Sequence, residues 1–180
     1  MYLIQSLGGL LNNFNEDYLK SSFNNFETKK DTDISYFLKY LSIEYEKKDI
    51  TRTFLIYDAN NKGCLLGYFT IGLNILKLQE NLKIPDAYSG VHLYEKGYHP
   101  IYKLFMIGKN DNALKKLSIK SEIFEKEVMG RFLELKKDIG TNLVYLDCTK
   151  ELVPYYKNLG FTFFDYDDKS KLYNLIYKMV

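Results

Sequence analysis

The stretch IYKLFMIGKNDNALKKLSIKSEIFEKEVMGRFLELKKDIGTNLVYLDC, residues 101–148, decides the fold class of this chain. It begins and ends with apolar runs of strand length, Ile101–Ile107 and Asn142–Cys148. Between these runs, apolar residues at three- and four-residue intervals predict a long helix over about 119–139, which Gly140 is placed to end. A strand, a helix and a second strand in this order predict two parallel strands joined by a right-handed crossover.

An antiparallel hairpin is predicted upstream of this crossover. Thr51–Asp58 (TRTFLIYD) and Cys64–Leu78 are rich in β-branched and aromatic residues, and the sequence ANNKG between them has typical turn chemistry. Gly67 and Gly72 lie inside the second run, where a glycine indicates a bulge or a close approach of another backbone.

Helices and a second hairpin complete the predicted order of elements. Glu16–Phe26 has the spacing of a short amphipathic helix, and a second helix follows Asp33, whose side chain can cap it. Thr149–Leu159 is a last helix, and Phe161–Tyr166 pairs with Lys171–Lys178 in a closing hairpin. The order α α β β β α β α β β predicts an α+β domain with a mixed sheet.

The bulk composition is that of an ordinary globular protein. The chain has 180 residues, of which 46% are hydrophobic and 27% charged, and a formal net charge of +2. These values predict one domain over residues 1–180 and give no electrostatic footprint for nucleic acid. The first residues lack the basic start of a signal peptide, and no apolar run approaches the roughly 20 residues that span a bilayer. We therefore expect a cytoplasmic protein with neither a membrane nor a nucleic acid among its partners.

The cysteines and histidines form no recognisable motif. Cys64 and Cys148 lie far apart in apolar strand contexts, where cysteine usually acts as a small buried hydrophobe. His92 and His99 fall in the irregular stretch 79–100, and we expect both at the surface. No metal site is predicted.

This order of elements, with these residues on it, resembles the GCN5-related N-acetyltransferase (GNAT) superfamily over about residues 33–180. TRTFLIYDANNKGCLLGYFTIG resembles the second and third strands of the family. IYKLFMIGKNDNALKKLSIKSEIFEKEV resembles its fourth strand, pyrophosphate loop and long helix. NLVYLDC, followed by LVPYYKNLGFTFF, is similar to its fifth strand and its final aromatic-Tyr-x-x-x-Gly-Phe segment. The resemblance implies a central twisted mixed sheet flanked by helices, in which the parallel fourth and fifth strands splay apart.

The resemblance also implies acetyl-CoA as the acetyl donor. The pantetheine arm would lie beside the end of the fourth strand. The pyrophosphate would lie at the following helix start, where orphan N–H groups and the positive dipole end favour an anion. The implied cofactor-binding residues are Phe105, Met106, Ile107, Gly108, Lys115, Lys116, Leu117, Ser118, Ile119, Lys120 and Ser121.

The pyrophosphate loop departs from the family pattern Gln/Arg-x-x-Gly-x-Gly/Ala. The aligned residues here are Ala113, Lys116 and Ser118. A lysine in place of glycine removes the clearance that lets a backbone approach phosphate, although it adds a positive charge.

Tyr156 is the catalytic acid that the resemblance implies. In the family pattern, the second aromatic of the final segment directs its hydroxyl toward the cofactor sulfur, and a phenol can donate a proton to the departing thiolate. Its neighbour Tyr155 would pack inward. Without the resemblance, both tyrosines would be interpreted as core and rim aromatics of an amphipathic helix.

The general base has several candidates. The amine arrives protonated, and many family members remove its proton with a carboxylate on the fourth or fifth strand. Asp147, at the end of NLVYLDC, is the residue we assign. Tyr145, Asp86 and Glu95 are the alternatives.

These features together predict an acyltransferase that moves an acetyl group from acetyl-CoA to a primary amine by direct attack in a ternary complex. The acceptor would be a small molecule or a peptide amine. The composition does not select between a polyamine, an amino sugar, a peptide and aminoacyl-tRNA, although the last would be expected with a basic surface. The alternative is a non-catalytic acyl-CoA-binding or regulatory module on the same fold. A homodimer through a strand at Leu172–Val180 is a further alternative.

Overall fold

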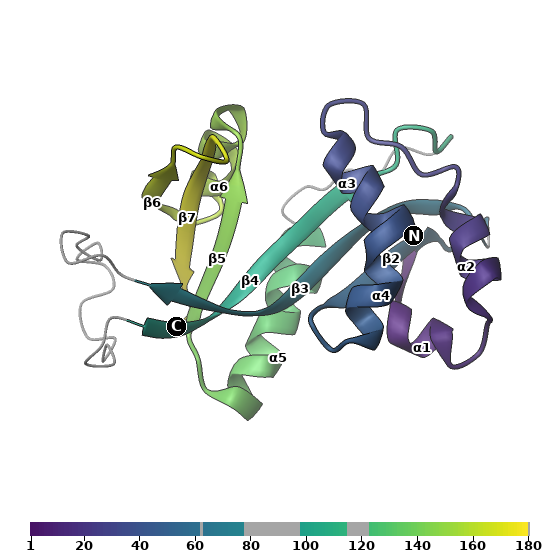
Figure 1. The fold of residues 1–180 in the computed structure, drawn as a ribbon, viewed down its shortest axis with the longest axis horizontal. Helices are drawn as coiled ribbons and strands as arrows, with labels where there is room; N and C mark the ends of the chain where they lie inside the picture. Colours follow the sequence, from purple (N-terminus) through teal and green to yellow (C-terminus); the bar gives the residue numbers. More distant parts are fainter. Residues whose placement is uncertain (62, 78–97, 115–122, 180) are drawn as a thin grey trace. The chain divides into compact units, whose positions relative to one another are not determined.

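The structure, a computed structural model, describes residues 1–61, 63–77, 98–114 and 123–179 (Figure 1). The chain forms two compact units. Unit 1 consists of Met1–Gly72 and Phe105–Phe124, and unit 2 of Leu73–Leu104 and Glu125–Val180. The chain leaves unit 1 after Gly72 and returns to it at Phe105, so these two boundaries fall inside the strands Leu65–Lys77 and Tyr98–Lys109.

Seven strands in the order β1-β2-β3-β4-β5-β7-β6 make a mixed sheet. β4 and β5 run parallel, and the pairs β1–β2, β2–β3, β5–β7 and β6–β7 are antiparallel. The predicted parallel crossover and the α+β fold class are therefore confirmed. The strands are β1 (Tyr2–Ser6), β2 (Arg52–Asp58), β3 (Leu65–Lys77), β4 (Tyr98–Lys109), β5 (Leu143–Cys148), β6 (Thr162–Asp167) and β7 (Leu172–Lys178).

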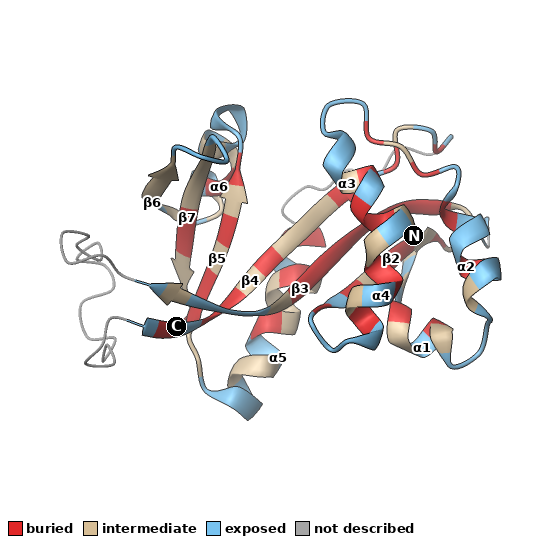
Figure 2. Ribbon diagram, in the orientation of Figure 1, coloured by how far each residue is buried: buried red, intermediate tan, exposed pale blue. Residues whose placement is uncertain are grey.

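In unit 1, helices cover one face of the first strands. They are α1 (Leu7–Leu11), α2 (Glu16–Phe23), α3 (Thr32–Tyr36), the π-helix η1 (Phe37–Leu41) and α4 (Ser42–Lys47). Their apolar residues join Leu55 of β2 and Tyr68 of β3, which face each other across the ladder, in one buried cluster. Figure 2 shows buried positions along β3 and the helices of this unit in red. The cluster is completed by Leu7, Leu10, Leu19, Phe23, Phe26, Phe37, Leu38, Ile43 and Leu65. Burying each such leucine or phenylalanine contributes about 1.5–3 kcal/mol, so this face holds the unit together.

Short polar side chains cap the helices of unit 1. The side chain of Asn15 accepts a hydrogen bond from Tyr18 N and begins α2. The side chain of Asp31 accepts one from Asp33 N and begins α3. The prediction that Asp33 caps this helix is therefore wrong by two residues: Asp33 lies in the first turn, where its charge favours the helix dipole.

Glu46 is a buried carboxylate near the end of α4. It is 6% exposed, and its Oε2 accepts a hydrogen bond of 2.8 Å from Thr53 N. Burial raises the pKa of this carboxyl, and the hydrogen bonds and the Arg52 guanidinium offset the shift only in part. Glu46 thus ties α4 to β2 at an electrostatic cost.

The β2–β3 hairpin has the irregularities that its glycines predict. The register shifts between Ile56 and Tyr57, which pair with Gly67 and Leu65, so Leu66 is the extra residue of a bulge. Gly72 is a close approach: a Cβ there would lie 2.9 Å from Ile50 O and 2.9 Å from Phe105 Cε2. Both features that interior strand glycines indicate therefore occur in this one strand.

In unit 2, α5 (Gly130–Ile139) and α6 (Val153–Asn158) accompany the strands. The π-helix η3 (Ile123–Met129) precedes α5, and the 3₁₀-helix η4 (Lys150–Leu152) precedes α6. The ring of Phe132 on α5 lies 5.6 Å from that of Tyr102 on β4, which places α5 against the strand. Gly140 ends α5 with φ +85°, as predicted.

Two parts of the fold differ from the sequence-based expectation. β1 and α1 were not predicted, because five-residue elements give too short a pattern. β4 begins at Tyr98, three residues before the predicted start, so His99 lies in a strand and is 2% exposed. The expectation of a surface position is therefore wrong for His99, whose pKa is lowered by burial. In the part of the chain that the structure describes, no helix has the length and apolarity to cross a membrane.

Candidate active site

The parallel ladder between β4 and β5 is short. It joins Tyr102, Lys103 and Leu104 to Val144, Tyr145 and Leu146, respectively. The ladder ends there, although β4 continues to Lys109 and β5 to Cys148. The end of β5 keeps its antiparallel partner, since Cys148 pairs with Tyr173 of β7. The ladder ends at Leu104 of β4, which is also the last residue of that strand in unit 2.

The predicted pantetheine-binding residues Phe105–Gly108 form the second half of β4, in unit 1. Met106 packs against the buried cluster of that unit. Gly108 is buried, and a Cβ at this position would overlap the Cγ2 of Ile34 on α3. The absence of a side chain therefore allows α3 to contact the backbone of β4 directly.

The predicted pyrophosphate-binding residues, Lys115, Lys116, Leu117, Ser118, Ile119, Lys120 and Ser121, lie outside the described residues. The turn just before them is described. There, Asn110 N donates a hydrogen bond of 2.7 Å to Leu66 O, and Ala113 N donates one of 3.3 Å to Asn110 O. The start of the loop is thus fixed against β3.

Asp147, the assigned base, lies in a polar cluster of unit 2. Its Oδ2 is 2.5 Å from Lys103 Nζ, and the side chains of Lys103 and Asp147 are only 16% and 24% exposed. Lys103 Nζ also lies 5.2 Å from the centre of the Tyr145 ring, close enough for a cation–π contact. The carboxylate is therefore held in place by a partly desolvated cation on the neighbouring strand.

Tyr145 is a donor to this carboxylate and not an alternative base. Burial, and then the charge of Asp147 to which its hydroxyl hydrogen bonds, raise the pKa of Tyr145 far above its usual range. A phenol in this state stays protonated at neutral pH and cannot take a proton from an amine. The strand register sets Asn174 of β7 opposite both Asp147 and Asp165, so a second carboxylate shares this region. Asp86, Glu95 and His92 lie outside the described residues.

Tyr156 is the buried residue of α6. It is 6% exposed, and its ring lies 5.1 Å from that of Tyr155 and 5.9 Å from that of Phe161. Burial raises the pKa of its hydroxyl, and the nearby Cys148 raises it further. The phenol is therefore protonated at physiological pH. Tyr155, expected to pack inward, is less buried than Tyr156.

Cys148 does not have the character of a nucleophile. Cys148 is 5% exposed, and burial raises the pKa of its thiol to about 11. At that pKa the thiolate is scarce at neutral pH. Within the described ranges, no group of three or more His, Cys, Asp or Glu side chains is placed to hold a metal ion.

Two residues with structural roles at this site were missed from the sequence. Lys103 interrupts the apolar run IYKLFMI, and a charged residue inside a buried strand requires a partner. Asn110 belongs to KNDN, the polar run that follows the predicted strand. Asparagine and aspartate bond readily to nearby backbone, so this run could have been recognised as a structured turn.

Comparison with known proteins gives matches by structure only. No protein-family model matches the chain, and neither does any curated protein. A solved structure of AtaT complexed with acetyl-methionyl-tRNAfMet superposes with a TM-score of 0.73 at 13% identity, over 99% of this chain and 95% of that one. A tyrosine-to-phenylalanine variant of KacT superposes with a TM-score of 0.70 at 15% identity, over 98% of this chain and 94% of that one. AtaTR bound with AcCoA superposes with a TM-score of 0.66 at 13% identity, over 98% of this chain and 92% of that one.

These neighbours share the fold of this chain and correct one expectation. AtaT was solved with a tRNA, and the AtaT–AtaR complex with DNA at a TM-score of 0.64. Proteins of this fold therefore meet nucleic acid, and the expectation that nucleic acid is excluded, drawn from a net charge of +2, is wrong. Net charge averages over the whole surface and says little about the local surface that meets a phosphate backbone.

Proposed function

We propose that this chain, whose fold is that of the GNAT superfamily, transfers an acetyl group from acetyl-CoA to a primary amine. The observation that carries the proposal is the β4–β5 ladder, which stops at Leu104 and Leu146 on this fold. Past that point, the backbone of Phe105–Gly108 would pair with the amides of the pantetheine arm. A neighbour of the same fold, AtaTR, was solved with AcCoA bound.

Acetyl-CoA would supply an activated acyl carbonyl and a thiolate leaving group. The contribution of the chain is to orient and polarise that carbonyl. Backbone N–H groups at the end of β4 are the proposed donors, and one such donor is typically worth about 10²–10³ in turnover. Holding the amine and the carbonyl in attack geometry supplies a further large part of the rate.

Tyr156 is the proposed acid. Its raised pKa keeps the hydroxyl protonated, so it can donate a hydrogen bond to a developing sulfur anion. The same high pKa makes full proton transfer unfavourable before the carbon–sulfur bond begins to break. Tyr156 would therefore act late, when the negative charge is on the sulfur.

Asp147 is the proposed base. The carboxylate is fixed by Lys103 and Tyr145, which leaves its position well defined for accepting a proton from the amine, directly or through water. As the base, Asp147 would exchange part of its contact with Lys103 for the incoming proton.

The acceptor that we propose first is the α-amino group of an aminoacyl-tRNA. The support is the likeness to AtaT, whose structure was solved with acetyl-methionyl-tRNAfMet. An N-acetylated aminoacyl-tRNA is the product of the same chemical step proposed here. Acetylation of an amine does not by itself require an aminoacyl-tRNA as the acceptor. Polyamines, amino sugars and peptides are therefore included in the test.

The test has two stages, binding and turnover. Titration calorimetry with acetyl-CoA should give saturable binding, and thiol release should follow when an acceptor is added. The acceptors to compare are methionyl-tRNA, other aminoacyl-tRNAs, spermidine, glucosamine and a lysine peptide. Absence of any binding heat at millimolar acetyl-CoA would exclude the proposal. Ser118→Asp sets a negative charge at the predicted pyrophosphate site and should weaken acetyl-CoA binding. Unchanged affinity would show that this loop is not the pyrophosphate site.

A second candidate function is a non-catalytic acyl-CoA-binding module. Lys116, at a position where the family pattern has glycine, is the observation that favours it. This module would bind acetyl-CoA and release no thiol with any acceptor of the panel. Binding without turnover therefore separates the two functions.

A further inference from the structure

Asn110, the first residue after β4, is a buried asparagine whose polar atoms contact three separate segments. It is 4% exposed. Its Nδ2 donates to Leu65 O at 2.9 Å, and its Oδ1 accepts from Glu27 N at 3.1 Å and from Asn112 N at 3.0 Å. Its backbone N donates to Leu66 O. Asn110 therefore joins β3, the segment between α2 and α3, and its own turn.

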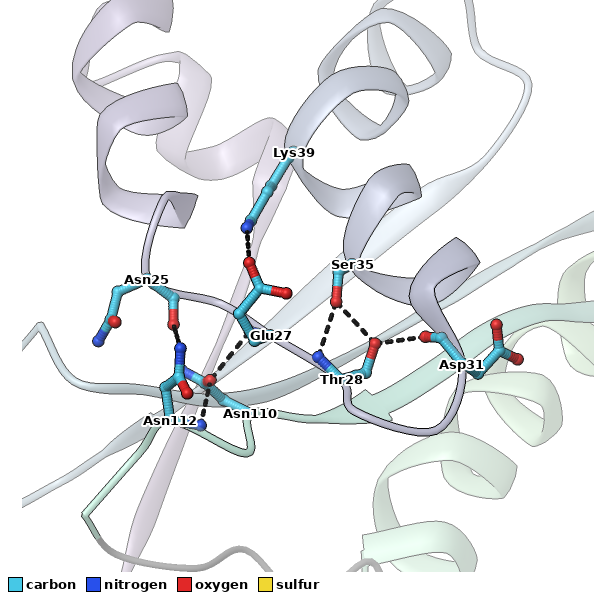
Figure 3. A network of polar contacts seen from close by, with 8 residues as sticks. All are labelled: Asn25, Glu27, Thr28, Asp31, Ser35, Lys39, Asn110 and Asn112. Atoms are coloured by element: carbon cyan, nitrogen blue, oxygen red, sulfur yellow. Dashed lines mark hydrogen bonds and ion pairs between the residues drawn. The ribbon is translucent and has the colours of Figure 1, made fainter.

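The rest of the turn is joined to the same segment of unit 1. Figure 3 shows the contacts of Asn110 and Asn112 with this segment. Asp111 N donates to Glu27 O at 2.7 Å, and Lys29 N donates to Asp111 Oδ2 at 2.8 Å. Asn112 Nδ2 reaches Asn25 O at 3.4 Å. Both backbone polar groups of Glu27 are thus engaged by residues more than 80 positions later in the chain.

The segment that holds this turn is itself tied to the helices. The carboxylate of Glu27 pairs with Lys39 of η1, whose side chain is 15% exposed. Thr28 N donates to Ser35 Oγ of α3 at 2.7 Å, and the Thr28 hydroxyl donates to Asp31 O. On the β4 side, Gly108 leaves room for Ile34 of α3. The end of β4 is therefore contacted by α3 directly and through Asn110.

We propose that Asn110 is a positioning residue for acetyl transfer, which holds the end of β4 at the orientation that carbonyl polarisation requires. The inference rests on the proposed function, because the N–H groups concerned are those of Phe105–Gly108. A preorganised donor loses its value when it can move, and a displacement of about 1 Å can cost about 100-fold in rate. Asn110 acts through the backbone and does not itself contact the reactants.

The test compares Asn110→Ala with Ser42→Ala in the intact chain. Ser42 is 0% exposed in the same unit, and its Oγ donates to Leu38 O at 2.6 Å, so its variant also loses a buried polar contact. We expect N110A to lower kcat and to weaken acetyl-CoA binding by about tenfold or more each. Ser42→Ala should change neither kcat nor the affinity for acetyl-CoA. This difference between the variants should persist when their melting temperatures are the same. Amide exchange of residues 106–109 should rise in N110A alone.

Asn110→Ser covers the case in which N110A fails to fold. Its hydroxyl keeps a local acceptor for the turn and is too short to donate to Leu65 O, so its effect should have the same direction and a smaller size. If either folded Asn110 variant matches Ser42→Ala in kcat, affinity and amide exchange, the positioning role is overturned. If the wild-type chain binds no acetyl-CoA, it is the proposed function that fails, and the two failures are distinct.

Discussion

The Nζ of Lys103 on β4 lies 2.5 Å from the Oδ2 of Asp147 on β5, and both residues occupy strands made mostly of apolar residues. Lys103 pairs with Tyr145 in the parallel ladder, and Asp147 follows the last paired residue of β5, Leu146. Removing one partner leaves the other charge partly buried without its counter-ion.

Lys103→Met should lower the free energy of unfolding by about 1–3 kcal/mol, because it leaves the Asp147 carboxylate uncompensated. Lys103→Met combined with Asp147→Leu should recover part of that loss, since no charge then remains. Urea denaturation of the two single variants and the double variant measures the coupling. Simple additivity would show that the pair is not coupled.

Asp147→Asn tests the base. We expect turnover to fall by about 10²-fold or more, because the amide cannot accept the proton, while the affinity for acetyl-CoA stays unchanged. The matched control is Asp165→Asn, which removes the carboxylate on the other side of Asn174. Steady-state kinetics that show equal losses of turnover for both variants would assign the effect to the loss of a negative charge in this region, and not to proton acceptance by Asp147.

Tyr156→Phe tests the acid. The ring packing against Tyr155 and Phe161 is retained, so the fold and cofactor affinity should persist while kcat falls by about tenfold or more. Tyr155→Phe serves as the control and should keep most of the activity. The measurement is the initial rate of thiol release. Wild-type turnover by the Tyr156 variant across the pH range would exclude Tyr156 as the acid.

Gly108→Ala should destabilise unit 1 by about 1–3 kcal/mol, because its Cβ would overlap Ile34 Cγ2. Adding Ile34→Ala should relieve the overlap, so the double variant should lose less than the sum of the two single variants. Gly130→Ala is the contrasting control, since a Cβ at that helical position meets nothing within 4 Å and should stabilise by up to about 1 kcal/mol. Thermal melts of the four variants measure these differences.

Glu46 should make the stability of unit 1 depend on pH. Because burial raises its folded pKa, the folded chain keeps the Glu46 proton to a higher pH than the unfolded chain. Its contribution is fully favourable below the ordinary pKa of 4.5 and is lost as the pH rises through the raised value. The unfolding free energy of Glu46→Gln, relative to wild type, should therefore increase between pH 4 and pH 7. A difference that stays constant over this range would contradict the assignment.

The sequence predicted the strands and helices whose patterns were long and regular. The β2–β3 hairpin, the crossover and the β6–β7 hairpin were all predicted, because their apolar residues recur at the period of the element. Helix details were harder: Asp31 and Asp33 are equally good caps by composition, and the choice depends on how the preceding loop is held. The π-turns of η1 and η3 have no local signal of this kind.

The strands and the helix that carry the candidate site residues were predictable, but the contacts of these residues were not. The strand that carries Lys103 followed from its apolar run, whereas the Lys103–Asp147 pair joins residues 44 positions apart. Such a pair depends on strand register, which a single sequence does not specify. The contact of Asn110 with Glu27 depends on tertiary packing in the same way.

The make-up of unit 1 also has a consequence for synthesis on the ribosome. Its second stretch ends at Phe124, 52 residues after its first stretch ends at Gly72. At ordinary translation speeds, roughly 3–10 s separate the emergence of these two points. Until Asn110 emerges within that delay, the carbonyls of Leu65 and Leu66 lack the hydrogen bonds that Asn110 donates to them. Nascent β3 therefore presents an open edge.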